Sequence, residues 1–125
     1  MNKLSKKWMK KLRKNPRKAQ GGLRRGKGYC CLGIAARNVL KLKKYNLEGL
    51  GGIPTPMCQL LGLHHALGET IHKSPLKRNG QIIKAEGRKE ITSLAQLNDV
   101  CDFDHRQHAE IIEENEKILF TKGEE

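Results

Sequence analysis

The charged residues of this chain are segregated along its length. Residues 1–28 hold twelve Lys or Arg and no Asp or Glu, whereas residues 99–125 hold nine acidic and three basic residues. The first segment alone therefore matches the +12 net charge of the whole chain. Such a block usually marks an interaction tail rather than part of a packed core. We expect residues 1–28 to form a basic arm, residues 29–120 a compact domain and residues 121–125 a frayed tail.

The size and the cysteine content predict one intracellular domain. A chain of 125 residues is about one domain long, and none of its apolar runs approaches the ~18 residues of a membrane span. Its first residues have the charge of a secretory signal, but no apolar stretch follows them. We therefore predict a cytoplasmic protein without a cofactor. Reduced thiols are expected there at all four cysteines, which are Cys30, Cys31, Cys58 and Cys101.

The basic segment begins with an amphipathic pattern. Leu4, Trp8 and Leu12 recur at a spacing of four with lysines on the other faces, which predicts a helix over residues 3–14. Pro16 ends that pattern. Residues 17–28 contain four glycines among five cations and predict a loop or a short hairpin.

Buried and turn-forming segments follow. Residues 29–43 predict a buried helix or, nearly as well, a buried strand that enters a helix. Residues 55–62 predict a helix that starts at Thr55-Pro56, and Gly62 predicts a left-handed cap at its end. The pair Asn79–Gly80 is typical of a hairpin, which we place within residues 69–91.

Two capping boxes predict the last helices. Ser93 and Gln96 begin a short helix that ends near Asn98, and Asp104 and Gln107 begin a final helix that reaches about Leu119. The predicted fold is a small single α+β domain, mainly helical, with four to five helices and one short β-hairpin. Asn98 and Asp99 are interpreted as a structural turn past the short helix, with a ligand site as the alternative.

The order of these motifs resembles a family of small uncharacterised proteins of tailed bacteriophages and prophages. The likeness is carried by the segments Tyr29–Gly33 (YCCLG), 53–63 (IPTPMCQLLGL), 94–99 (LAQLND) and 103–113. It covers roughly residues 8–115 and implies a phage accessory protein, with no activity to transfer. Residues 37–52 depart from the family, because they are shorter and more basic than its usual connector.

The basic arm is the strongest functional signal. Cations at this density could neutralise several phosphates, so we predict a non-enzymatic protein that binds nucleic acid through the arm. The residues predicted to bind nucleic acid or another acidic partner are Lys6, Lys7, Lys10, Lys11, Arg13, Lys14, Arg17, Lys18, Arg24, Arg25 and Lys27. Trp8 and Tyr29 could stack on unpaired bases. The interpretation favoured for Trp8 is instead that it packs onto the core.

Two other partners fit the same charge pattern. The arm could dock on an acidic groove of a host protein, such as a defence or nucleic-acid enzyme, which would make the chain a phage-encoded inhibitor. The helix could also lie on an anionic membrane, but its apolar face of three turns is too short for strong anchoring.

Metal binding and catalysis are weaker hypotheses. Cys101, His105 and His108 are spaced as a possible zinc set, to which Cys58 with His64 or His65 could add a ligand, yet the paired short spacings of structural zinc sites are absent. The alternative of a zinc-binding structural module stays open on this set. No cysteine lies in a recognisable nucleophile motif, and we predict no catalytic residue.

Overall fold

The computed structural model describes residues 1–16, 18, 24–25, 28–41, 55–85, 89–101 and 103–121. These residues form a mainly helical α+β domain, as the sequence predicts, with two short hairpins. The C-terminal residues 122–125, predicted to be a frayed tail, lie outside the described part of the chain. None of the described helices is both long and apolar enough to cross a bilayer.

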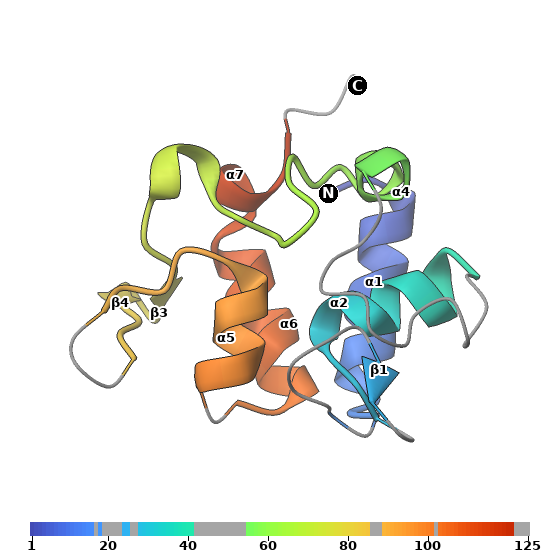
Figure 1. Cartoon of the computed structure of the whole chain (residues 1–125), viewed down its shortest axis with the longest axis horizontal. Coiled ribbons are helices and arrows are strands. Elements are labelled where there is room, and N and C mark those ends of the chain that lie inside the picture. The colour runs from blue at the N-terminus through green and yellow to red at the C-terminus, as the bar shows by residue number, and fades with distance from the viewer. Residues whose placement is uncertain are drawn as a thin grey trace.

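Two antiparallel helices form one layer of the fold. Helix α1 (Lys3–Arg13) lies beside helix α6 (His105–Glu114), and Figure 1 shows them running in opposite directions. Their ends are tied together, because the N-terminal ammonium group of Met1 pairs with Glu116. At the other end, the backbone N–H of His105 donates to Asn15 Oδ1 at 3.2 Å. Helix α1 is therefore fastened at both ends.

A second layer covers these two helices. Helix α2 (Cys31–Ile34) continues into the π-helical turn η1 (Ala35–Val39), which packs on α1, and α2 also contacts α5 (Leu94–Val100). Helix α4 (Thr55–Leu60) lies near the N-terminus of α1 (Figure 1). The segment predicted as a buried helix, residues 29–43, is described as far as Lys41. It contains a buried helix, and the end of a hairpin strand leads into that helix.

The core joins the basic segment to the rest of the chain. Trp8 and Leu12 are fully buried in the same cluster as Leu32, Ile112 and the other large apolar side chains. The indole N–H of Trp8 donates to the Cys31 carbonyl at 2.8 Å. The favoured interpretation of Trp8 as a core residue is therefore confirmed, and α1 is a core helix rather than an arm apart from the domain.

The turns predicted at Gly62 and at Asn79–Gly80 are present. Gly62 has a φ of +81°, and the N–H groups of Leu63 and Gly62 donate to Cys58 and Gln59, which is the Schellman arrangement. Asn79 and Gly80, at φ of +53° and +80°, connect β3 (Lys77–Arg78) to β4 (Gln81–Ile82) as a hairpin. The first hairpin, β1 (Arg24–Arg25) with β2 (Gly28–Tyr29), confirms the turn predicted within residues 17–28.

Two expectations about helix ends are wrong. The short helix does not end near Asn98, because α5 runs to Val100 and the buried Asn98 lies inside it, with Oδ1 accepting from the Cys31 N–H at 3.2 Å. The final helix does not continue to Leu119. It stops at Asn115, whose side chain bonds both backbone groups of Lys77, and the separate helix α7 (Glu116–Leu119) follows.

Gly68 provides a test of close packing. Its φ is +68°, and a Cβ there would lie 2.7 Å from Leu94 Cβ, an atom fixed to its own backbone. We expect Gly68→Ala to lower the free energy of unfolding by at least about 2 kcal/mol, because a left-handed alanine and a steric clash add together. Urea denaturation measures this loss.

The matched control for that substitution is Gly80→Ala. Gly80 has a similar φ of +80°, but a Cβ there would meet no atom within 4 Å. Only the backbone strain remains in this variant, which is about 1–2 kcal/mol. Equal losses in the two variants would show that the clash with Leu94 does not contribute.

Candidate nucleic-acid interface

The exposed side of α1 is a row of lysines. Five of them project from one face of the helix, and we call this set the lysine face: Lys3, Lys6, Lys7, Lys10 and Lys14. Lys3, Lys6, Lys10 and Lys14 follow one another at intervals of three or four residues, and Lys7 lies between Lys3 and Lys10 on the same side of the 3.6-residue turn. Eleven residues separate the first from the last, so the lysine face is about 16 Å long at 1.5 Å per residue.

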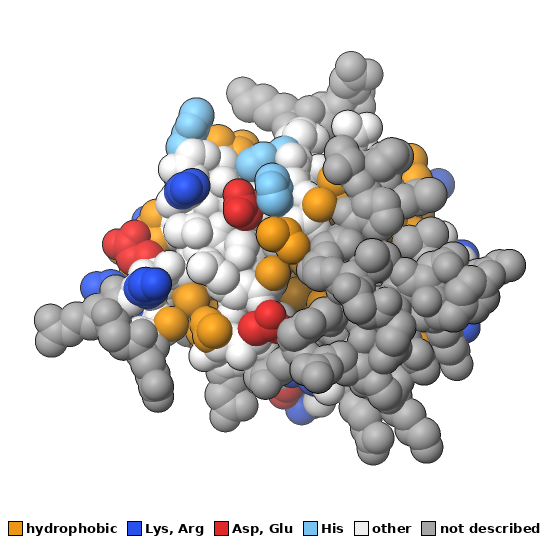
Figure 2. All heavy atoms as spheres, in the orientation of Figure 1, with side chains coloured by type: hydrophobic (Ala, Val, Ile, Leu, Met, Phe, Trp, Pro, Cys, Tyr) orange, Lys and Arg blue, Asp and Glu red, His pale blue; other side chains and the backbone are white. Residues whose placement is uncertain are grey.

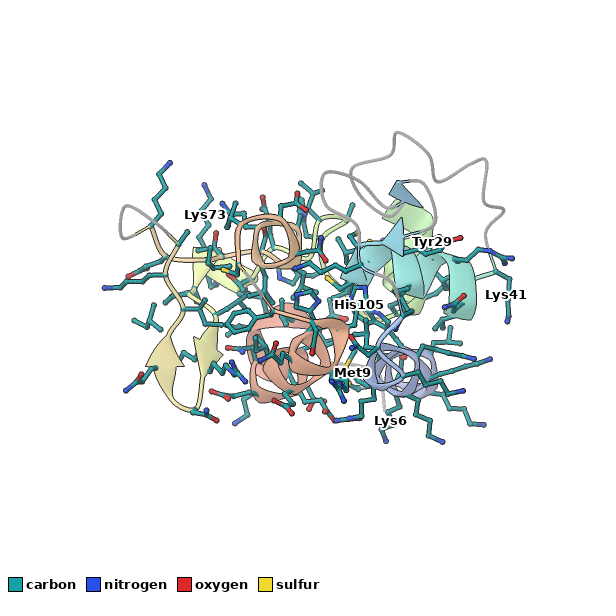
Figure 3. The ribbon with its side chains drawn as sticks, turned by 90° about the horizontal axis from the view of Figure 1, so that it is seen from below. Lys6, Met9, Tyr29, Lys41, Lys73 and His105 are labelled. Atoms are coloured by element: carbon teal, nitrogen blue, oxygen red, sulfur yellow. The ribbon has the colours of Figure 1, made fainter. Side chains whose placement is uncertain are left out.

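The opposite side of α1 determines where the lysine face points. Ser5, Trp8, Met9 and Leu12 are buried on that side, and Asn2 caps the helix by accepting from the Ser5 N–H at 2.9 Å. Since the buried side faces α6 and α2, the lysines must face solvent. Figure 3 shows Lys6 projecting away from the body of the molecule, whereas Met9 lies toward α6.

The nearby carboxylates of α6 have other partners. Glu113 pairs with Arg13, and Glu110 lies 3.9 Å from Arg78 on the second hairpin. Arg13 is therefore partly neutralised, although the sequence places it in the binding set. Neither carboxylate reaches a member of the lysine face.

The next two carboxylates are engaged as well. Glu114 accepts from the backbone N–H groups of Asn79 at 2.7 Å and Gly80 at 3.0 Å, and these bonds lower the pKa of its carboxyl group. Glu116 pairs with the N-terminal ammonium group. In the described part of the chain, no ion pair forms to the lysine face. Its positive charge is thus uncompensated there.

The remaining predicted binding residues do not extend the lysine face as one arm. Lys11 is half-buried at its edge. Lys18 donates to the carbonyls of Phe103 at 2.9 Å and Cys101 at 3.3 Å, so it ties the α5–α6 connection to the chain rather than facing a partner. Arg17 and Lys27 lie outside the described residues.

Arg24 and Arg25 lie in the first hairpin, of which the structure describes the backbone alone at these two positions. Figure 3 places that hairpin, marked by Tyr29, on the side of α2 opposite to Lys6. The backbone of this hairpin and Lys6 therefore lie on opposite sides of α2 in that view. Burial of Trp8 and Leu12 places the first helix of the predicted arm in the core, and the binding role of residues 1–28 stays a prediction.

Two exposed lysines were missed by the sequence interpretation. Lys3 belongs to the lysine face, and its spacing of seven residues from Lys10 would have identified it. Lys41 follows η1 with a φ of +62°, and Figure 3 shows it at the edge of the half of the molecule that contains α1. No sequence pattern indicated that residue.

The face of the molecule toward the viewer in Figure 2 differs from the lysine face. Among its coloured side chains, blue and red groups occur side by side with orange apolar ones. Lys73 lies on this half of the molecule, far from Lys6 in Figure 3. Lys73 therefore lies on a surface that carries both charge signs, and it provides a control position for substitutions in the lysine face.

In the described ranges, Trp8 and Tyr29 do not provide an open stacking surface near α1. Trp8 is buried against Phe120, with ring centroids 6.4 Å apart at an interplanar angle of 68°. Tyr29 is half-buried, and its carbonyl bonds Nε2 of His105 at 2.9 Å. The hypothesis that Trp8 stacks on bases is wrong for the folded chain.

A buried histidine pair connects α6 to the first hairpin. Because the Tyr29 carbonyl only accepts, Nε2 of His105 must carry the proton, and its Nδ1 then accepts from Nδ1 of His108 at 3.2 Å. Nε2 of His108 is left unprotonated and buried without a hydrogen-bond partner. Burial, together with the charge of His105, lowers the pKa of His108 to about 3. Both rings are thus neutral at physiological pH.

The cysteines and histidines do not assemble a reactive or metal-binding group in the described residues. None of the four cysteines forms a disulfide, and burial raises the pKa of Cys30 to about 11 and that of Cys31 well above its usual value. Such thiols carry little thiolate at neutral pH. In the described ranges, no three histidine, cysteine or acidic side chains are placed to hold a metal ion, including the set of Cys101, His105 and His108.

Comparison of the chain with protein-family models, with curated proteins and with solved structures found no match. The resemblance to the phage family therefore stays a prediction.

Proposed function

We propose that the lysine face of α1 binds the phosphate backbone of nucleic acid without reading its base sequence. The observation that carries the proposal is the row of five exposed lysines on one helix, with the neighbouring carboxylates already engaged elsewhere. Each phosphate that a lysine neutralises releases condensed counterions, and this release favours binding at low salt. Lysine ammonium groups act as point charges, which suits phosphates better than base edges.

The proposal predicts a steep salt dependence. If four or five lysines each contact a phosphate of a duplex, the plot of log affinity against log salt concentration has a slope of about −4. Binding of the whole chain to a fluorescent oligonucleotide of about 20 nucleotides or base pairs, followed by anisotropy between about 50 and about 200 mM salt, measures that slope. A slope near zero would contradict the proposal.

Removing three charges from the lysine face should weaken binding. We expect the variant Lys6→Gln/Lys7→Gln/Lys10→Gln to reduce the magnitude of the slope by about 2–3 and to lower affinity about 10–100-fold near 100 mM salt. These side chains are exposed, and glutamine has a helix propensity close to that of lysine, so the fold should persist. Circular dichroism checks this point.

The matched control removes the same charge from another part of the surface. Lys73, Lys77 and Lys84 are also exposed, and they lie in η2 (Ile71–Lys73), in β3 and just after β4. We expect the variant Lys73→Gln/Lys77→Gln/Lys84→Gln to change affinity less than about threefold, through net charge alone. Equal losses in the two triple variants would show that overall charge, and not the lysine face, governs binding.

A further inference from the structure

We infer that the nucleic acid recognised by the lysine face is double-stranded. This inference rests on the proposed function and specifies its partner. It combines the rigidity of α1, the linear arrangement of its charges and the engagement of the aromatic side chains in the core. Each of these favours a stiff phosphate row over a flexible strand.

Helix α1 is held rigidly by contacts along its whole length. One end is fixed by the pair between Met1 and Glu116, and the other by the bond between Asn15 and the N-terminus of α6. Between them, Trp8 and Leu12 are fully buried. The backbone that carries the lysine face is therefore held straight and does not adapt to a curved or flexible strand.

The lysine face carries its charges along α1 at an average spacing close to the phosphate spacing of one strand of a duplex. Four intervals between five lysines span about 16 Å of helix, or roughly 4 Å per charge. A duplex carries one phosphate per about 3.4 Å on each strand and one per about 1.7 Å of axis when both strands are counted. A single strand is flexible, so that ordering it along the same row would cost conformational entropy.

Single-strand binders usually offset this cost by stacking bases on aromatic side chains, at about 1–3 kcal/mol per base. Among the described residues, the rings of Trp8, Phe120 and Phe103 have partners inside the protein. Trp8 is buried and bonded to the Cys31 carbonyl, and Phe120 packs edge-on against it. Phe103 lies under the guanidinium group of Arg78, 4.9 Å from its ring centroid. In the described residues, the lysine face therefore offers phosphate contacts and no stacking partner.

The test compares four labelled probes of one mixed sequence, each about 20 nucleotides or base pairs long. The probes are a DNA duplex, an RNA duplex and a single strand of each. Comparing the two duplexes shows whether the preferred backbone is that of DNA or that of RNA. We expect at least one duplex to bind the whole chain about tenfold or more tightly than its own single strand near 100 mM salt. Single strands that bind as tightly as both duplexes would overturn the inference.

Trp8 is the single tryptophan of the chain and supplies a second measurement. Its emission maximum should not move when a duplex saturates the protein, because the indole stays in the core. Strong quenching by the unlabelled duplex would contradict the inference, since it would place bases against Trp8. If none of the four probes binds, the proposed function itself fails, and a single-strand preference with the expected salt slope would overturn the duplex inference alone.

Discussion

Replacing Trp8 with alanine is expected to lower the free energy of unfolding by about 3–5 kcal/mol. Trp8 is fully buried between α6 and α2, and it contacts Phe120 edge-on. The substitution removes the largest side chain of the core and leaves a cavity, and it also leaves the Cys31 carbonyl without its donor. A domain of this size has about 5–15 kcal/mol of stability in total, so much of it would be lost.

Two further variants separate the causes of that loss. Trp8→Phe retains most of the buried ring but removes the N–H group, and we expect it to cost about 1–3 kcal/mol because a buried acceptor loses its donor. Lys7→Ala changes an exposed neighbour and should stay within about 0.5 kcal/mol of the wild type. Urea denaturation followed by far-ultraviolet circular dichroism measures all three. A loss below about 1 kcal/mol in Trp8→Ala would mean that α1 is not a core helix.

Stability should fall as the pH drops below 6.5, because His108 is buried in its neutral form. Its pKa is lowered from 6.5 to about 3 in the folded chain, first by burial and then by the charges of His105 and Lys18. Between these two values the unfolded chain binds the proton and the folded chain does not, so the free energy of unfolding decreases as the solution is acidified. Burial lowers the pKa of His105 as well, so both rings act in the same direction.

The loss of stability caused by His108 is best separated from that caused by the carboxyl groups between pH 6.5 and pH 4.5. Between pH 6.5 and pH 4.5, two units at about 1.4 kcal/mol each correspond to a loss of about 2–3 kcal/mol from His108. Asp104 and Glu114, whose pKa values are lowered by backbone N–H bonds, add their losses below that window. Urea denaturation at pH 6.5, 5.5 and 4.5 measures this loss for the wild-type chain.

A variant of the histidine itself isolates its contribution. His108→Gln has no group that titrates in this window, so the loss between pH 6.5 and pH 4.5 should shrink by at least half. His64→Gln provides the matched control, because it makes the same substitution at an exposed histidine. An unchanged profile in His108→Gln would show that His108 is not the group responsible.

Local signals in the sequence predicted much of the secondary structure. The Asn79–Gly80 turn, the left-handed Gly62 and the capping box of Asp104 all occur as expected, because each depends on the backbone conformation or side-chain bond of a few adjacent residues. The two wrong helix ends both involve long-range bonds. Asn98 is a residue type common in turns, yet it lies inside α5 and accepts from the Cys31 N–H, whereas Asn115 ends α6 and bonds the backbone of Lys77.

The sequence predicted which kinds of residue the candidate interface contains, but not which of them share one exposed surface. The sequence identified most of the cations of α1, and it favoured a packing role for Trp8. It could not separate Arg13 and Lys18 from the lysine face, because their partners are Glu113 and the carbonyls at the end of α5. These contacts join residues about 80 to 100 positions apart, which no local pattern encodes.

The sequence by itself determined the helical period of α1, its lack of acidic residues and the segregation of charge between the two ends of the chain. Those properties follow from residue types and their spacing along the backbone. The tertiary structure decided which cations stay free. Burial of Trp8 and Leu12 orients α1, and the antiparallel packing on α6 gives Arg13 a carboxylate and leaves the lysine face in solvent. Long-range packing selects those contacts, because side-chain partners depend on how the helices meet in space.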